Sequence, residues 1–128
     1  MATATLKSHN QPQRKTRLVT ELVKGKKVPA ALAALQFLPK RASATVAKLI
    51  SSAAANAKNR GENVDELVVK IIVENAGMLK KYMPRAFGRA SMIRRRKSRL
   101  IVTLALAPAK GKAASAATSA SSGSRPTK

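Results

Sequence analysis

A 23-residue stretch between two strand-like segments, residues 75–97, constrains the fold of this chain more than any other feature. The segments are 67–74 and 99–106, and both are rich in β-branched residues with apolar side chains at alternate positions. Compact domains usually join strands with fewer than about 12 residues. If the strands pair antiparallel, residues 75–97 run outward and back, and their midpoint is Ala86. The sequence therefore predicts a long β-hairpin arm that turns within Pro84–Arg89, where Pro and Gly favour a turn.

The predicted arm is strongly cationic. Residues 75–97 contain eight basic residues and no acid, and all five acids of the chain come earlier. Ten residues at roughly 3.3 Å each would carry the tip on the order of 30 Å from the sheet, and such a ribbon has no core of its own. An isolated basic run such as 94–97 is more often a solvated or targeting segment. Its place in an acid-free arm instead favours support by nucleic acid phosphates.

The chain as a whole has the charge of a protein that binds a polyanion. Its 128 residues include 26 Lys and Arg against 5 Asp and Glu, for a formal net charge of +21. Nucleic acid and an anionic membrane surface both fit that charge. The length allows one domain, expected over residues 1–106, with a small aliphatic core. Residues 107–128, rich in Ala and Ser with four basic residues, are predicted to form a disordered tail.

Three helices are predicted ahead of the strands. The first spans about 12–24, begins at a proline and ends before Gly25. The second spans 29–39 between two prolines. The third spans about 40–60 with an apolar stripe at helical spacing, formed by Ala42, Val46, Leu49, Ile50, Ala53 and Ala57. Residues 3–7 are predicted to form a third, short strand. Helices that precede the main strands predict an α+β fold, with three helices packed on a small three-stranded antiparallel sheet.

The sequence excludes several classes of function. The chain has no Cys, and its single histidine, His9, is predicted to be a surface residue. No metal constellation, Gly-rich phosphate loop or acid-base pair is present, so we expect no catalytic activity, metal, cofactor or small-molecule substrate. No run approaches the roughly 18 apolar residues of a membrane span, and the start lacks the apolar stretch of a secretory signal. These features predict a cytoplasmic protein.

The basic residues of the arm and of the helices are the predicted nucleic-acid contacts. They are Arg14, Lys15, Arg17, Lys24, Lys26, Lys27, Lys40, Arg41, Lys48, Lys80, Lys81, Arg85, Arg89, Arg94, Arg95, Arg96, Lys97 and Arg99. Two interpretations stay open for the aromatic residues of the arm. Tyr82 and Phe87 either stack on unpaired bases or pack on the arm itself.

Several motifs resemble those of the bacterial large-subunit ribosomal protein twenty-two family, over about residues 8–106. They are Arg14-Lys-Thr-Arg-Leu-Val19, Lys24-Gly-Lys-Lys-Val28, Ala31-Leu32 with Leu35, Pro39-Lys-Arg41, Ser51-Ser-Ala-Ala-Ala-Asn-Ala57 and, most specific, Lys80 with Arg85-Ala-Phe-Gly-Arg89 and the alternating Leu100, Val102 and Leu104. The chain departs from the family pattern at Arg99, where His, Asp or Asn is more usual. It also departs at Gln11-Pro-Gln13, which replaces a more usual Ser-Pro-Arg.

The resemblance implies a structural role on the ribosome. The family's three-helix, three-strand domain sits on large-subunit ribosomal RNA beside neighbouring ribosomal proteins and supports subunit assembly. Its hairpin tip helps to line the exit tunnel of the nascent polypeptide, and here that tip would be Pro84, Arg85, Ala86, Phe87, Gly88 and Arg89. An alternative is a histone-like architectural DNA-binding protein, which also carries a basic β-arm. A membrane-active domain fits less well, because the third helix has an Ala-heavy stripe rather than large apolar residues.

Overall fold

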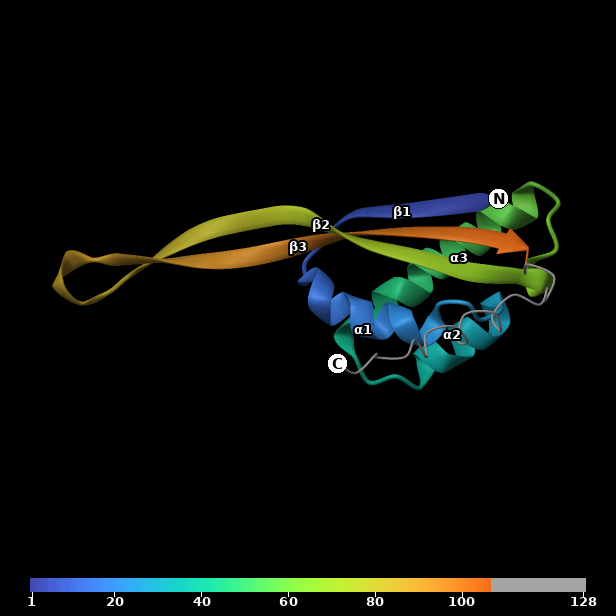
Figure 1. Cartoon of the computed structure of the whole chain (residues 1–128), viewed down its shortest axis with the longest axis horizontal. Helices are drawn as coiled ribbons and strands as arrows, with labels where there is room; N and C mark the ends of the chain where they lie inside the picture. The colour runs from blue at the N-terminus through green and yellow to red at the C-terminus, as the bar shows by residue number, and fades with distance from the viewer. Residues whose placement is uncertain (107–128) are drawn as a thin grey trace, which may run out of the picture.

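The computed structural model describes residues 1–106 and has an α+β architecture in which three helices lie on one side of a three-stranded sheet (Figure 1). The elements in chain order are β1 (Ala2–His9), α1 (Gln13–Val23), α2 (Val28–Gln36), α3 (Arg41–Asn59), the short 3₁₀ helix η1 (Val64–Glu66), β2 (Leu67–Pro84), the 3₁₀ turn η2 (Ala86–Gly88) and β3 (Ala90–Leu106). This arrangement confirms the predicted fold class. The predicted disordered tail, residues 107–128, lies outside the described residues.

The sheet has the strand order β1-β3-β2, and both pairings are antiparallel. Alternate residues of β2 and β3 point toward the helices, so that Val69 faces inward beside Leu104 and Ile71 beside Val102. The apolar stripe predicted on α3 belongs to the same core as these strand residues, and all six residues of the stripe are buried. The core is therefore small and aliphatic, and it lies between the three helices and the sheet.

Helix α1 carries two apolar pairs at i, i+4 spacing, and only one of them is buried. Val19 and Val23 face the sheet, together with Thr16 and Thr20, while Leu18 and Leu22 are exposed. The helix ends before Gly25, whose φ of 80° is the left-handed conformation expected at a helix C-terminus. The buried threonines satisfy their hydroxyl groups by donating to backbone carbonyl oxygens one turn earlier.

The basic loop between α1 and α2 pairs with the outer edge of β2. The backbone N–H of Gly25 donates to the carbonyl oxygen of Val69 at 2.9 Å, and the N–H of Val69 donates to the carbonyl oxygen of Lys26 at 3.0 Å. Helix α2 then begins at Val28, with Pro29 in its first turn, and ends at Gln36. The loop thus covers an edge strand that would otherwise expose unpaired backbone groups.

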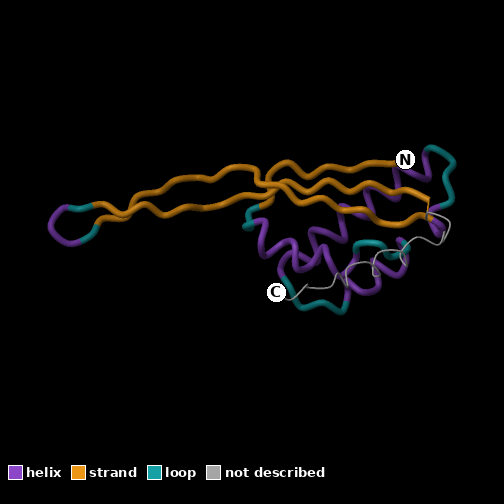
Figure 2. Tube along the Cα trace, in the orientation of Figure 1, coloured by secondary structure: helices purple, strands orange, loops and turns teal. Residues whose placement is uncertain are grey.

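Strands β2 and β3 continue beyond the body of the protein as a two-stranded ribbon, which we call the arm (residues 75–97) (Figures 1 and 2). The last pair is Pro84 with Ala90, so the centre of the turn is Phe87. The predicted midpoint, Ala86, was wrong by one residue, in part because β2 contains a bulge and in part because Asn75 pairs with Ser98 rather than with Lys97. Between the pairs Asn75–Ser98 and Met78–Arg96, two residues of β2 oppose one residue of β3.

Candidate nucleic-acid interface

The pairing register divides the cations of the arm between its two faces. Residues directly opposite each other in an antiparallel pair project to the same side of the ribbon. One face therefore carries Met78, Lys80 and Tyr82 from β2 with Arg96, Arg94 and Met92 from β3; the other carries Leu79, Lys81 and Met83 with Arg95, Ile93 and Ser91. Both faces are exposed, and each places apolar side chains among its cations.

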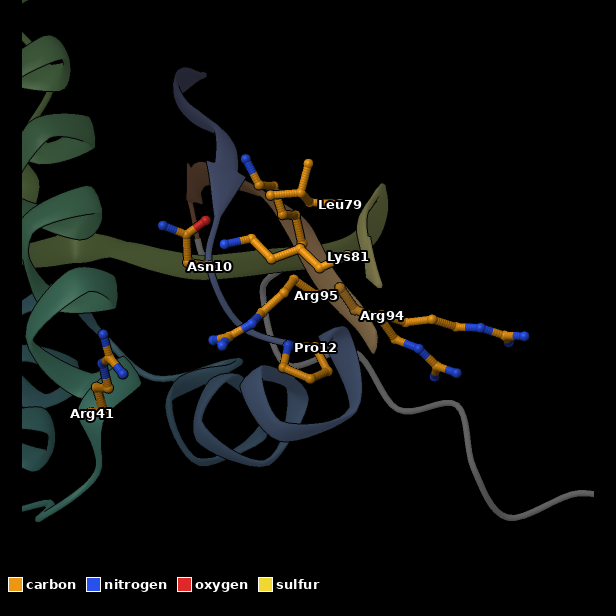
Figure 3. Close-up of a pocket in the computed structure, with 9 residues that line it drawn as sticks. Asn10, Pro12, Arg41, Leu79, Lys81, Arg94 and Arg95 are labelled. Carbon is orange, nitrogen blue, oxygen red and sulfur yellow. The ribbon is translucent and has the colours of Figure 1, made fainter. Parts of the chain in front are cut away.

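A crevice of about 690 Å³ lies where the arm leaves the body (Figure 3). Six of its nine lining residues are Lys or Arg, and none is acidic. Figure 3 shows Lys81 and Arg95 extending toward the β1–α1 loop, where Asn10 and Pro12 lie, while Arg41 projects from the start of α3. The remaining lining residues are Leu79, Arg94, Arg96 and Lys97. This concentration of positive charge in a concave site favours binding of phosphate groups.

A second crevice, of about 660 Å³, lies between α1 and the arm. Arg14 and Arg17 from α1 line it together with Arg96, which also lines the first crevice. Arg17 also has a structural contact, because its Nη2 donates a hydrogen bond to the carbonyl oxygen of Val73 at 3.3 Å. Arg96 and Pro12, the residues common to both crevices, mark the place where the two basic surfaces meet.

The other predicted contact residues are exposed but lie outside both crevices. Lys24, Lys26 and Lys27 belong to the loop that pairs with β2 near the end of the body away from the arm. Lys48 lies on the exposed side of α3, and Lys15 on the exposed side of α1. The structure therefore unites Arg14, Arg17 and Arg41 with the base of the arm and leaves the remaining helix cations on separate surfaces.

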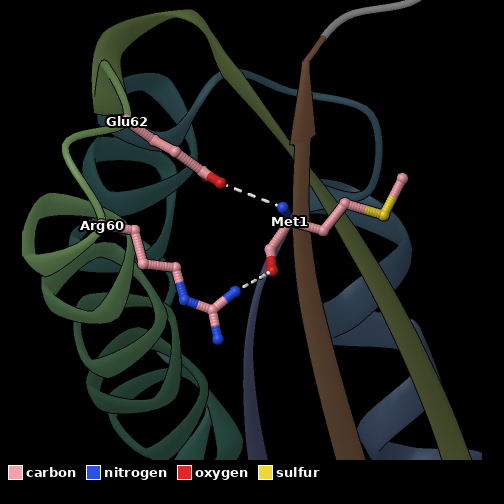
Figure 4. Close-up of polar contacts among 3 residues, drawn as sticks. All are labelled: Met1, Arg60 and Glu62. Carbon is pink, nitrogen blue, oxygen red and sulfur yellow. Dashed lines mark hydrogen bonds and ion pairs between the residues drawn. The ribbon is translucent and has the colours of Figure 1, made fainter.

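Two acids of the body form ion pairs with cations outside the arm. One oxygen of Glu62 accepts from the α-amino group of Met1 at 3.0 Å, and Arg60 donates to the carbonyl oxygen of Met1 (Figure 4). Glu74 lies 3.9 Å from the guanidinium of Arg99, and both side chains are about half exposed. Such an exposed pair contributes little stability. Arg99 thus differs from the arm cations in having an acidic neighbour.

The tip of the arm is a tight, hydrogen-bonded turn. The backbone N–H of Arg85 donates to the carbonyl oxygen of Arg89 at 2.7 Å, and the Arg85 Nε donates to Ser91 Oγ at 3.1 Å. Phe87 has a φ of 58°, in the left-handed region, and its side chain is 98% exposed. Tyr82 is 70% exposed. The structure therefore decides against the interpretation in which Phe87 packs on the arm.

Sequence reasoning missed two polar residues that help to form the interface. Asn10 lines the first crevice, and Ser91 orients Arg85. Neither is charged, so the search for basic residues passed over them; the position of Ser91 across from Met83 emerges only from the register. His9, expected at the surface, is partly buried, and its Nε2 has no hydrogen-bond partner within residues 1–106.

Two further observations concern the described part of the chain. Across residues 1–106, no helix has the length and apolar character needed to traverse a bilayer. Over the same range, no cluster of three or more His, Asp or Glu side chains is placed to hold a metal ion.

Comparison with known proteins gives one consistent result. A family model described as ribosomal protein L22p/L17e matches residues 4–105. The large ribosomal subunit protein uL22 of Pelotomaculum thermopropionicum is 50% identical over 93 residues, which cover 71% of this chain and 82% of that protein. The protein of the same name from Pelobacter propionicus is 48% identical over 105 residues, covering 80% of this chain and 95% of the relative.

Proposed function

Since the chain belongs to the ribosomal protein L22p/L17e family, we propose that it binds large-subunit ribosomal RNA through its arm and the two basic crevices, and supports subunit assembly there. As a member of this family it is a structural protein of the ribosome in the cytoplasm and not an enzyme. Its further partners in this proposal are neighbouring ribosomal proteins and, at the arm tip, the nascent polypeptide.

The observation that carries this proposal is the crevice at the base of the arm. It gathers cations from β2, from β3 and from the start of α3, and its lining contains no acid. In the free protein these like charges repel one another within the crevice, and phosphate groups from a folded RNA would neutralise them. Binding of this kind depends on shape and charge more than on base sequence, because the A-form major groove is too narrow for side chains to read.

The exposed loop cations are proposed as additional phosphate contacts on the body. Lys24, Lys26 and Lys27 are held in place by the pairing of their loop with β2, so their side chains project from a fixed backbone. A protein with separate basic surfaces on its body and arm can contact RNA segments that are distant in the RNA sequence. Holding such segments together is the contribution we propose to subunit assembly.

The tip, Pro84–Arg89, is proposed to form part of the tunnel wall. A thin, exposed ribbon reaches a narrow site that the body of the protein could not enter, and the arm has this shape (Figure 2). A photo-reactive cross-linker in place of Ala86 is expected to capture the nascent chain in translating ribosomes. The same cross-linker in place of exposed Ala44 of α3 should not capture it. Equal capture from both positions would contradict the tunnel assignment.

RNA binding is tested by a salt titration of the full chain with large-subunit ribosomal RNA in a filter-binding assay. If about 6–10 phosphates are neutralised, affinity falls by about 10³ or more between 50 and 200 mM salt. Duplex DNA of the same length should compete poorly. A flat salt response, or equal binding of duplex DNA, contradicts the proposal.

A matched pair of variants assigns the binding to the crevice. The double variant R95A/R96A removes two lining cations, and K58A/K70A removes two exposed cations from the body that line neither crevice. Both variants lose the same net charge. We expect R95A/R96A to lower the slope of log affinity against log salt by about two, and K58A/K70A to leave it nearly unchanged. Equal losses would mean that net charge alone governs binding.

A further inference from the structure

Phe87 is an aromatic side chain displayed at the centre of the arm tip without any covering contact. Its ring is 98% exposed, although a phenylalanine gains free energy by burial. Its neighbours in the turn are Ala86 and Gly88, whose small or absent side chains leave the ring open. The ring is therefore accessible from the solvent around the tip.

The backbone at Phe87 is held in a conformation that phenylalanine disfavours. Its φ of 58° lies in the left-handed region, where glycine and asparagine are far better tolerated than a bulky residue. The turn would therefore form more readily with Gly at this position. Phe87 thus combines two unfavourable features, exposure and backbone strain, and a residue with both is a candidate for a direct role in binding.

The charges around the ring indicate the kind of ligand. Arg85 and Arg89 flank the turn, and the hydrogen bond from Arg85 Nε to Ser91 Oγ holds one guanidinium beside it, while the Nη groups of Arg85 make no hydrogen bond within residues 1–106. No acid occurs anywhere in residues 75–97. An aromatic face between two cations matches an unpaired nucleotide, whose base stacks on the ring and whose adjoining phosphates meet the guanidinium groups.

We propose that Phe87 is a base-stacking residue, which receives one unpaired nucleobase of the RNA while Arg85 and Arg89 bind the flanking phosphates. This inference rests on the proposed RNA-binding function and adds to it a specific residue and a ligand class. Phe37 provides a matched control, because it is also a phenylalanine that is 87% exposed, but it lies on the body at the end of α2 with an ordinary φ of −83°.

Tryptophan fluorescence offers a direct test, since the chain contains no natural Trp. The full-length variants F87W and F37W each carry a single indole, and stacking on a base quenches indole emission. On addition of large-subunit ribosomal RNA we expect strong quenching for F87W and little change for F37W. Unchanged emission of F87W under conditions where the wild-type chain is bound would overturn the inference.

Affinity measurements separate the ring from the turn. F87G removes the ring and relieves the strained backbone, so the turn itself is preserved, whereas F87Y keeps a ring. We expect F87G to bind the RNA about tenfold more weakly, F87Y to bind like the wild type, and F37A to show no loss. In probing of 2′-hydroxyl flexibility, one unpaired nucleotide should be protected by wild type and F87Y and left reactive with F87G.

The outcomes distinguish this inference from the proposed function. If the wild-type chain fails to bind large-subunit RNA, the proposed function itself is wrong. If the wild-type chain binds with a steep salt dependence and F87G binds equally well with the same protection pattern, only the stacking role is overturned. If F87W emission changes only when the ribosome carries a nascent chain, the ring contacts polypeptide instead, and the inference fails.

Discussion

Lys80 and Arg94 lie directly opposite each other in the antiparallel pairing of β2 with β3, so two positive charges share one position on the same face of the arm. Like charges at directly opposed positions destabilise a ribbon, and opposite charges there contribute roughly 0.2–1 kcal/mol. The arm therefore carries a pair that weakens it when free. Phosphate placed between these side chains removes the repulsion, which links the stability of the arm to its proposed ligand.

The first prediction concerns a variant that reverses the charge of Lys80. In K80E a carboxylate faces Arg94, so the free arm should become more stable, and amide hydrogen exchange along 78–84 should slow severalfold at low salt. Binding to RNA should weaken, because a phosphate contact is replaced by a repelling group. The control is K81E, since Lys81 lies opposite Ile93 and gains no such partner. Equal slowing of exchange in both variants would show that net charge, and not the cross-strand pair, controls the arm.

The second prediction concerns the bulge at the base of the arm. Gly77 has a φ of 89°, and its N–H donates to Asn75 Oδ1 at 3.2 Å. A methyl group there would meet no atom within 4 Å, so the cost of G77A, about 1–2 kcal/mol, comes from the backbone conformation alone. We expect faster amide exchange throughout the arm.

The control for the bulge is G61A, which replaces another glycine of positive φ, 73°, in equally open space beyond the end of α3. It should lower the unfolding midpoint of the body without accelerating exchange in the arm. If G77A leaves arm exchange unchanged, the bulge does not determine the register.

The third prediction separates structural from binding roles on α1. Arg17 joins α1 to β2 by its hydrogen bond to the Val73 carbonyl, so R17A should lower the free energy of unfolding by about 1 kcal/mol. Arg14 lines the same crevice and makes no side-chain hydrogen bond within residues 1–106. R14A should therefore weaken RNA binding at unchanged stability. Chemical denaturation with a binding titration on both variants checks this, and a stability loss in R14A equal to that in R17A would refute it.

The secondary structure was predictable because it rests on local patterns. The alternation in 67–74 and 99–106 predicted inward rows that the structure buries except at Leu106, which is exposed at the end of β3, and the 3.6-residue spacing predicted the buried stripe of α3. Prolines and glycines marked the helix ends within a few residues. Such patterns show which side of a helix or strand faces the core, so each can be recognised from the sequence of that segment alone.

The remaining features depend on contacts between distant segments. Two equivalent i, i+4 pairs in α1 could have faced the core, and the sequence did not indicate that Val19, and not Leu18, would be buried. The bulge shifted the register of the arm by one residue and set Lys80, rather than Leu79, across from Arg94. The crevice follows from that register, because it decides which arm cations face Asn10 and Arg41. The geometry of the interface could therefore not be predicted from the sequence, although most of its charged residues could.

The last prediction tests whether the arm is separable from the body. Replacing residues 82–92 with Asn-Gly connects the paired residues Lys81 and Ile93 through a favoured two-residue turn. None of the replaced residues 82–92 is buried, so the variant should keep its thermal midpoint within about 4 °C. It retains every lining residue of both crevices and should still bind RNA, with a salt slope reduced by about two because Arg85 and Arg89 are absent. Unfolding of the shortened chain would mean instead that the outer arm stabilises the sheet, and complete loss of RNA binding would place the main contacts at the tip rather than at the base.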